Sequence, residues 1–143
     1  RRHSFPTRRS SDLLMSAVAT DTAFRQPARR FVEKRVAQQL PSWMYWFTWA
    51  TQAFDGAVGC CHALDIPFAF DNLSAPGTAV FTGDAPECQG IATRFADEIV
   101  GFAKHGHPSW GQYANDDRLT LEINADPLLL TDPEKDIRVL FVD

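Results

Sequence analysis

The sequence predicts an α/β fold whose sheet is incomplete. Three observations carry this prediction: an aromatic run at residues 43–49, apolar residues at helical spacing on both sides of it, and a short alternating segment near residue 120. Strands, helices and loops therefore alternate along the chain, but the strands are too few for a complete doubly wound sheet. Because a buried strand needs neighbours, we expect the chain to carry only part of its sheet.

The first expected helix covers residues 22–39. Its apolar side chains recur at mostly helical spacing, with arginines and lysine on the opposite face. Asp21 is expected to cap this helix, and Pro27 suits the first turn of its regular part, so an irregularity is expected near Pro27. Pro41 should end the helix.

The run at residues 43–49, Trp-Met-Tyr-Trp-Phe-Thr-Trp, has aromatic and apolar side chains on both faces. This pattern is typical of a strand that helices cover on both sides inside a parallel sheet. A base-stacking platform or a cofactor box could also use such a density of rings. We interpret the run as a buried strand.

Residues 50–88 contain several glycines and prolines, which predicts a loop-rich segment, and loops often carry functional sites. A second helix is expected over residues 86–105, where apolar residues recur every three or four positions. Gly106 is a suitable stop for it, with Pro108 just beyond.

The remaining segments are shorter. Residues 119–123 alternate leucine and isoleucine with polar residues, which predicts a short strand. Residues 126–136 are expected to be turn and loop, and residues 137–142 a further strand.

Charge is unevenly divided along the chain. Residues 1–13 hold four arginines against one aspartate, whereas the whole chain has a formal net charge of −4. Residues 3–13 also resemble the translation of a common short-read sequencing adapter. We therefore interpret residues 1–13 as an artefact and residues 14–143 as the protein; a basic tail is the alternative. Without residues 1–13 the chain is acidic and lacks a basic stripe, so no nucleic-acid partner is expected.

Composition narrows the class of protein further. At 143 residues with 45% hydrophobic and 22% charged residues, the chain is expected to be globular, and no apolar run approaches the length of a membrane span. Cys60, Cys61 and Cys88 form no recognisable disulfide framework, so reduced thiols are expected. Nothing in the sequence fixes the cellular compartment.

Residues 59–70 are the most informative segment, and His62 is its candidate catalytic residue. A histidine just past a strand, beside a glycine and small residues, can face a cleft while its backbone stays anchored. A general base needs that arrangement, because it must lie about 3 Å from the nucleophile's proton and later return that proton to the leaving group.

These residues resemble the type-B carboxylesterases, the family of the bacterial para-nitrobenzyl esterases and the cholinesterases. The resemblance extends over nearly the whole chain after Leu14 and rests on six blocks in the right order. The blocks are Thr20-Asp21 with Phe24, Pro27 and Ala28; residues 43–49; Gly59, His62, Ala63, Pro67, Phe68 and Phe70; Asn72-Leu73; Phe102-Ala103 with Gly106 and Pro108; and Trp110, Tyr113 and Arg118.

The resemblance implies an α/β-hydrolase fold of which this chain is the C-terminal portion. It implies that His62 is the histidine of a Ser-His-Glu or Ser-His-Asp triad and that the substrate is a small carboxylic ester. In α/β-hydrolases the order along the chain is nucleophile, acid, histidine, so serine and acid would lie upstream of this segment, and the segment alone would be inactive. No cofactor is implied. A non-catalytic binding or adhesion relative, which has lost its serine, is the alternative.

Two positions depart from the family's pattern, and other candidates are weaker. Asp65 stands where the family usually has glutamate, and Asp71 where it usually has glycine. His105 and His107 could be metal ligands, but no third ligand follows at a fitting spacing, so no metal is expected. Cys61 beside His62 is a weak alternative nucleophile pair. Trp49 and Phe54 are expected to line part of a substrate pocket.

Overall fold

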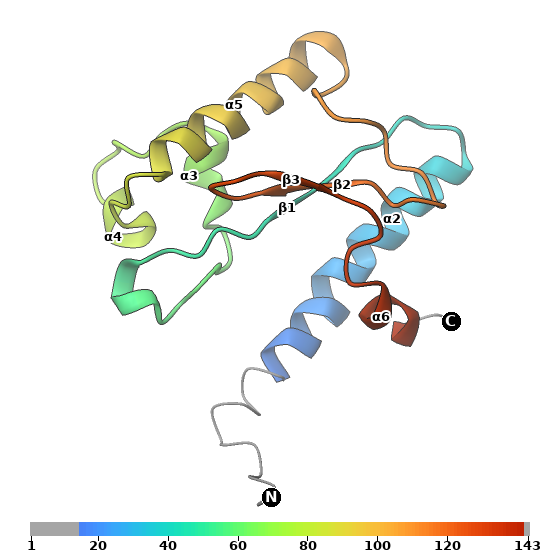
Figure 1. Cartoon of the computed structure of the whole chain (residues 1–143), viewed down its shortest axis with the longest axis horizontal. Helices are drawn as coiled ribbons and strands as arrows, with labels where there is room; N and C mark the ends of the chain where they lie inside the picture. Colours follow the sequence, from blue (N-terminus) through green and yellow to red (C-terminus); the bar gives the residue numbers. More distant parts are fainter. Residues whose placement is uncertain (1–14, 142–143) are drawn as a thin grey trace, which may run out of the picture. The chain divides into compact units, whose positions relative to one another are not determined.

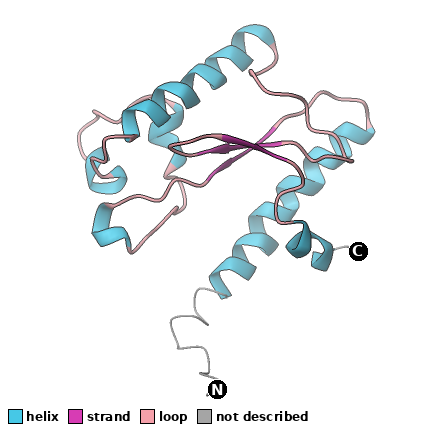
Figure 2. Cartoon of the chain, in the orientation of Figure 1, coloured by secondary structure: helices cyan, strands magenta, loops and turns pink. Residues whose placement is uncertain are grey.

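The computed structural model describes residues 15–141, drawn in Figures 1 and 2. The described residues divide into two compact units, one made of residues 15–42 with 134–141 and the other of residues 43–133. Residues 1–13, which we interpret as an artefact, lie outside the described residues. No helix among residues 15–141 is long and apolar enough to cross a membrane.

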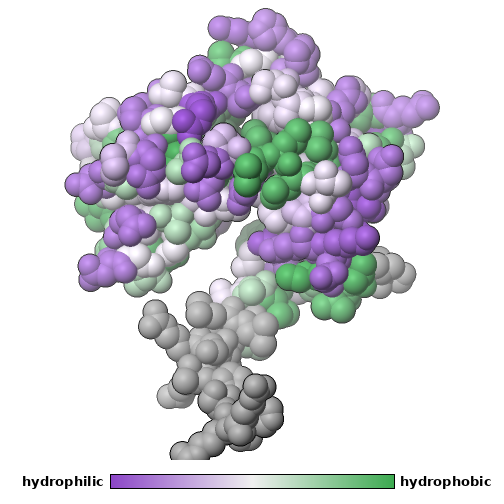
Figure 3. Space-filling model, in the orientation of Figure 1, coloured by the Kyte–Doolittle hydropathy of each residue, from purple (hydrophilic) through white to green (hydrophobic). Residues whose placement is uncertain are grey.

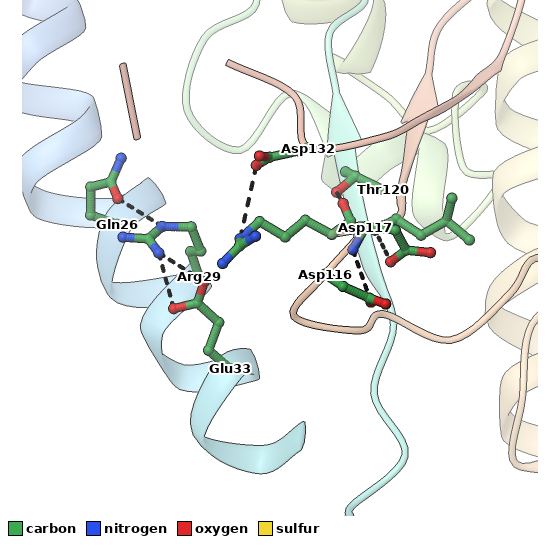
Figure 4. A network of polar contacts seen from close by, with 9 residues as sticks. Gln26, Arg29, Glu33, Asp116, Asp117, Thr120 and Asp132 are labelled. Carbon is green, nitrogen blue, oxygen red and sulfur yellow. Dashed lines mark hydrogen bonds and ion pairs between the residues drawn. The ribbon is translucent and has the colours of Figure 1, made fainter. Parts of the chain in front are cut away.

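The first unit is built on the helix expected over residues 22–39. Its first part, η1 (Asp21–Arg25), is a π-helical turn, and α2 (Gln26–Ala37) follows without a break. The wide turn lies directly before Pro27, whose ring nitrogen cannot donate the helical hydrogen bond. The irregularity near Pro27 is therefore confirmed. On the surface of α2, Arg29 lies between Gln26 and Glu33 and donates to both side chains (Figure 4).

Asp21 is not a helix cap, contrary to the expectation. Residues 15–20 are already helical, so the helix does not begin at Asp21. The Asp21 carboxylate instead accepts a hydrogen bond from Arg25 Nη1 at 2.6 Å, one turn further along. The helix begins before the residues whose apolar spacing predicts it, so that spacing indicates the wrong position for the cap.

The C-terminal strand expected over residues 137–142 is wrong over its described part. Helix α6 (Lys135–Arg138) and the short 3₁₀-helix η3 (Val139–Phe141) occupy this region. The Glu134 carbonyl accepts hydrogen bonds from the amides of Ile137 and Arg138, so the backbone is satisfied locally and needs no strand partner.

The second unit contains a three-stranded sheet in the order β1-β2-β3. Strand β1 (Met44–Phe47) pairs in parallel with β2 (Thr120–Ile123), Met44 opposite Thr120. Strand β3 (Leu128–Leu130) pairs antiparallel with β2. The strand expected near residue 120 is confirmed, but the loop expected over residues 126–136 contains β3. Three consecutive leucines show no alternation, so their strand was missed.

Strand β1 is less buried than the sequence suggested. Among the described residues it lies at the edge of the sheet, with a hydrogen-bonded neighbour only in β2. Tyr45 is accordingly 42% exposed, and the other residues of β1 are partly buried. Both faces of β1 would be buried only by further elements outside the described residues, as an incomplete sheet implies.

Helices α3 (Asp65–Ala69) and α5 (Cys88–His105) pack against each other beside the sheet, and α4 (Thr78–Thr82) lies between them in sequence (Figure 1). Helix α5 ends as expected at Gly106, whose φ of 77° is left-handed and whose amide donates to the Phe102 carbonyl. The core of this unit consists of Trp49, Leu64, Phe68, Cys88, Ile91, Ala92, Phe95 and Ile123.

Candidate active site

His62 lies at the end of the long connection that leaves β1, in the turn that leads into α3, and is exposed. Two hydrogen bonds join the end of this connection to its beginning. The Thr51 amide donates to the Gly59 carbonyl at 3.3 Å, and Cys60 Sγ donates to the Phe47 carbonyl at 3.0 Å. The chain that precedes the histidine is therefore fixed to the end of β1.

The chain that follows His62 is fixed by the core. Leu64 and Phe68 are fully buried, and the ring of Phe68 lies 5.1 Å from both Phe47 and Trp49, centroid to centroid. Ala63 makes the sharp change of direction between turn and helix at a φ of 65°. A small residue tolerates this left-handed conformation better than a bulky one. The histidine thus has a held backbone on both sides and a side chain at the surface.

The connection between β1 and His62 contains η2 (Ala53–Gly56), in which Phe54 and Asp55 both have φ near 55°. Thr51, which begins this loop, is fully buried. Its Oγ1 donates to the Phe81 carbonyl at 3.0 Å and accepts from the Ala53 amide at 3.0 Å. One side chain therefore holds the loop to α4.

Asp65 provides negative charge at the base of the site. Burial raises the pKa of the Tyr45 phenol, and the charge of Asp65 and a hydrogen bond to it raise that pKa further. The pKa of the Cys60 thiol is raised by burial first, then by Cys61 and Asp65. Cys60 as a residue is exposed, but its sulfur lies against the Phe47 carbonyl, which accounts for the burial effect. Asp65 thus connects β1 to the start of α3.

The two aromatic residues expected in a pocket have different environments. Trp49 is 3% exposed and belongs to the core, and its Nε1 donates to Glu87 at 3.2 Å. It is therefore part of the packing beneath the site. Phe54 is 59% exposed and stays a candidate for substrate contact.

The other sequence candidates lie apart from this arrangement or support it. His105 and His107 are exposed at the end of α5 with ring centroids 6.1 Å apart, and His107 Nδ1 lies 3.0 Å from the Pro108 carbonyl oxygen. Within residues 15–141, no group of three or more potential ligands could hold a metal. All three cysteines are unpaired thiols, and Cys61 is half-buried against the core.

Sequence reasoning missed the supporting residues Tyr45, Thr51 and Gly83. Gly83 has a φ of 71°, and a Cβ there would lie 3.4 Å from the Ala53 amide nitrogen. The glycine itself was a visible signal of a turn, but its neighbour in space is thirty residues away in sequence. No local pattern marks Thr51, because its partner at Phe81 comes from the tertiary structure.

The architecture is similar to that of solved α/β-hydrolase carboxylesterases. Against a carboxylesterase of Geobacillus stearothermophilus the TM-score is 0.78 at 28% sequence identity, covering 99% of this chain and 29% of that one. Against a thermophilic PNB esterase the TM-score is 0.75 at 26% identity, covering 86% and 26% of the two chains. The three-stranded sheet and its helices are therefore part of an α/β-hydrolase fold.

The sequence comparisons agree with the fold. The model of the carboxylesterase family matches residues 5–137. The chain belongs to the carboxylesterase family. It is 29% identical over 126 residues to the para-nitrobenzyl esterase of Bacillus subtilis (strain 168), an alignment that covers 83% of this chain. That alignment spans only 25% of the relative's length.

Proposed function

We propose that this chain is the C-terminal portion of a serine carboxylester hydrolase and that His62 is its catalytic histidine. The observation that carries the proposal is the placement of an exposed histidine between two anchored segments, at the end of the loop that follows the parallel strand β1. Membership of the carboxylesterase family supports the reaction class. The serine, the acid of the triad and the oxyanion donors are proposed to lie upstream, as the chain order of α/β-hydrolases requires.

In the proposed mechanism the His62 imidazole accepts the proton of the serine hydroxyl as that oxygen attacks the ester carbonyl. The protonated imidazole then gives the proton to the leaving alcohol, and an acyl-enzyme remains. Water then attacks the acyl-enzyme, with His62 again as the general base, and the carboxylic acid product is released. This segment alone supplies neither nucleophile nor oxyanion donors, so we expect it to be inactive.

The test begins with the source DNA across the junction between Leu13 and Leu14. An upstream reading frame with Gly-x-Ser-x-Gly followed by an acid would provide the intact enzyme. In that enzyme we expect His62→Ala to lower kcat/KM for 4-nitrophenyl acetate by roughly 10⁴-fold or more. His105→Ala is the matched control, since His105 is an exposed histidine at the end of α5, and it should leave the rate within about twofold.

Three outcomes would overturn the proposal. The upstream frame could lack a serine at the nucleophile position, which would favour a non-catalytic binding or adhesion relative. The intact protein could fail to hydrolyse esters. Finally, His62→Ala and His105→Ala could have equal effects on the rate, which would exclude His62 as the base.

A further inference from the structure

We propose that Phe54 is a specificity-determining residue that contacts the alcohol portion of the ester. The inference rests on the proposed function, because it assumes that His62 returns a proton to a leaving alcohol. Three features of the loop between β1 and His62 carry it: the anchoring of the loop, the left-handed backbone at its tip, and the exposure of one aromatic ring there.

The loop is closed and fixed at its base. The amide of Thr51 donates to the carbonyl of Gly59, and Gly59 precedes His62 by three residues. Three residues of chain span at most about 11 Å, so the base of the loop lies close to the histidine. Thr51 Oγ1 also holds the loop to the Phe81 carbonyl. The backbone that carries the Phe54 ring is therefore anchored at Thr51 and at Gly59, in the segment that leads to His62.

The tip of the loop has an unfavourable backbone. Phe54 (φ 55°, ψ 40°) and Asp55 (φ 55°, ψ 32°) are consecutive left-handed residues, neither of them glycine. A bulky side chain in this region is strained and persists where the surroundings impose it. Folding stability alone would favour glycine or asparagine at Phe54. The exposed ring of Phe54 therefore buries little surface against residues 15–141 that would offset this strain.

The ring of Phe54 differs in its exposure from the rings of Phe47, Trp49 and Phe68. Phe47, Trp49 and Phe68 pack against one another, whereas Phe54 is 59% exposed. An exposed phenylalanine on an anchored loop can bury an apolar or aromatic group of a substrate.

The part of the ester that Phe54 contacts is inferred from the role of His62 as general base. The histidine must be within hydrogen-bond reach of the leaving oxygen, so groups beside the histidine lie closer to the alcohol than to the acyl chain. The base of the Phe54 loop joins the segment that carries His62. We therefore place Phe54 against an aromatic or bulky apolar alcohol, and the acyl group elsewhere.

The experiment compares two ester series in the intact enzyme and its Phe54→Asn variant. Asparagine accepts the left-handed backbone but lacks the ring. We expect kcat/KM for benzyl acetate to fall about tenfold or more, while that for methyl acetate stays within about twofold. The ratio of methyl phenylacetate to methyl acetate should not change. Deacylation should also be unchanged, because both acetates give the same acetyl-enzyme.

Phe70→Asn is the matched control, since Phe70 is 77% exposed at the end of α3 and should leave both ratios unchanged. Should Phe54→Asn fail to fold, Phe54→Leu keeps an apolar side chain and should lower the benzyl ratio by a smaller factor. The inference is overturned if Phe54→Asn leaves the ratio of kcat/KM for benzyl acetate to that for methyl acetate unchanged, or if it changes the ratio for methyl phenylacetate to methyl acetate. In either case the proposed function still stands if the wild type hydrolyses esters and His62→Ala does not. Absence of hydrolysis in the wild type overturns both.

Discussion

The segment around His62 and the helix of the first unit differ in how far their apolar side chains are buried. Leu64 and Phe68 beside the histidine are completely buried among the rings of Phe47 and Trp49. In the helix, Phe31 is 66% exposed. Hydrophobic surface remains visible over both units in Figure 3. The segment that carries the candidate site has a core of its own, whereas the helix presents apolar side chains to solvent.

The difference concerns energy as well as geometry. Burial of a large side chain stabilises by about 1.5–3 kcal/mol, whereas an i,i+4 ion pair such as Arg29–Glu33 contributes about 0.3–0.5 kcal/mol. Intrinsic helix propensity and such pairs support η1 and α2, while packing supports the turn that holds His62. The candidate base is thus positioned by the better packed part of the chain.

The largest expected effect is on the core beside the histidine. Phe68→Ala removes a fully buried ring and should lower the free energy of unfolding of the 143-residue chain by about 3–5 kcal/mol. Phe31→Ala removes an exposed ring from the helix and should change it by less than about 0.5 kcal/mol. Urea unfolding of the two variants measures both values. Equal losses would show that the helix is as well packed as the core.

A smaller effect is expected at Thr51. Thr51→Val leaves the Phe81 carbonyl and the Ala53 amide without their hydroxyl partner, which should cost about 1–3 kcal/mol. Thr22→Val is the control, because Thr22 Oγ1 donates to the Val18 carbonyl at an exposed position on the helix, where a loss below about 0.5 kcal/mol is expected. Thermal unfolding compares the two variants. If Thr51→Val were neutral, the loop would be held by other contacts.

The smallest expected effect is electrostatic. Asp65 raises the pKa of Tyr45 and Cys60, so Asp65→Asn should lower both pKa values towards their ordinary range. The folded chain holds the Tyr45 proton more tightly than the unfolded chain, so this contribution to stability is present below about pH 10 and is lost as pH rises through the raised pKa. In the variant that loss should be smaller, because the pKa of Tyr45 in the folded chain then lies closer to its value in the unfolded chain.

Alkylation of Cys60 by iodoacetamide, followed by mass spectrometry from neutral to alkaline pH, checks the same change. The thiolate is the reactive form, so the variant should react at lower pH than the wild type. Cys88 serves as the internal control, because Glu87 and Asp84, and not Asp65, are the carboxylates that raise its pKa. An unchanged profile for Cys60 would mean that Asp65 does not contribute to its pKa.

Much of the local structure could be predicted where a single segment contains its own signals. Apolar spacing and Gly106 define α5, and Pro27 marks the irregular turn before α2. The C-terminal strand was wrong and β3 was missed, because strand pairing joins residues through hydrogen bonds that no single segment shows. For the site, the sequence indicated His62 as a candidate but gave no sign of the Tyr45–Asp65 contact.

Asp71 illustrates how a residue type in the sequence is related to a contact in the tertiary structure. It stands where the resembling family usually has glycine, and its φ of 47° is a conformation that glycine adopts without strain. Its carboxylate accepts a hydrogen bond from Gln89 at the start of α5, at 2.7 Å. A contact formed on folding therefore accompanies an aspartate in a left-handed turn conformation.

The sequence by itself determined the α/β class, the irregular turn near Pro27, the end of α5 at Gly106, and the histidine segment with its family resemblance. These are properties of residue type and short-range spacing, which the chain carries before it folds. Only the tertiary structure decided that Trp49 is core while Phe54 is exposed, that Thr51 holds the loop before His62, and that β1 lies at a sheet edge in this segment. The physical reason is that burial and hydrogen bonding depend on which distant residues become neighbours, and adjacent positions in sequence do not specify those neighbours.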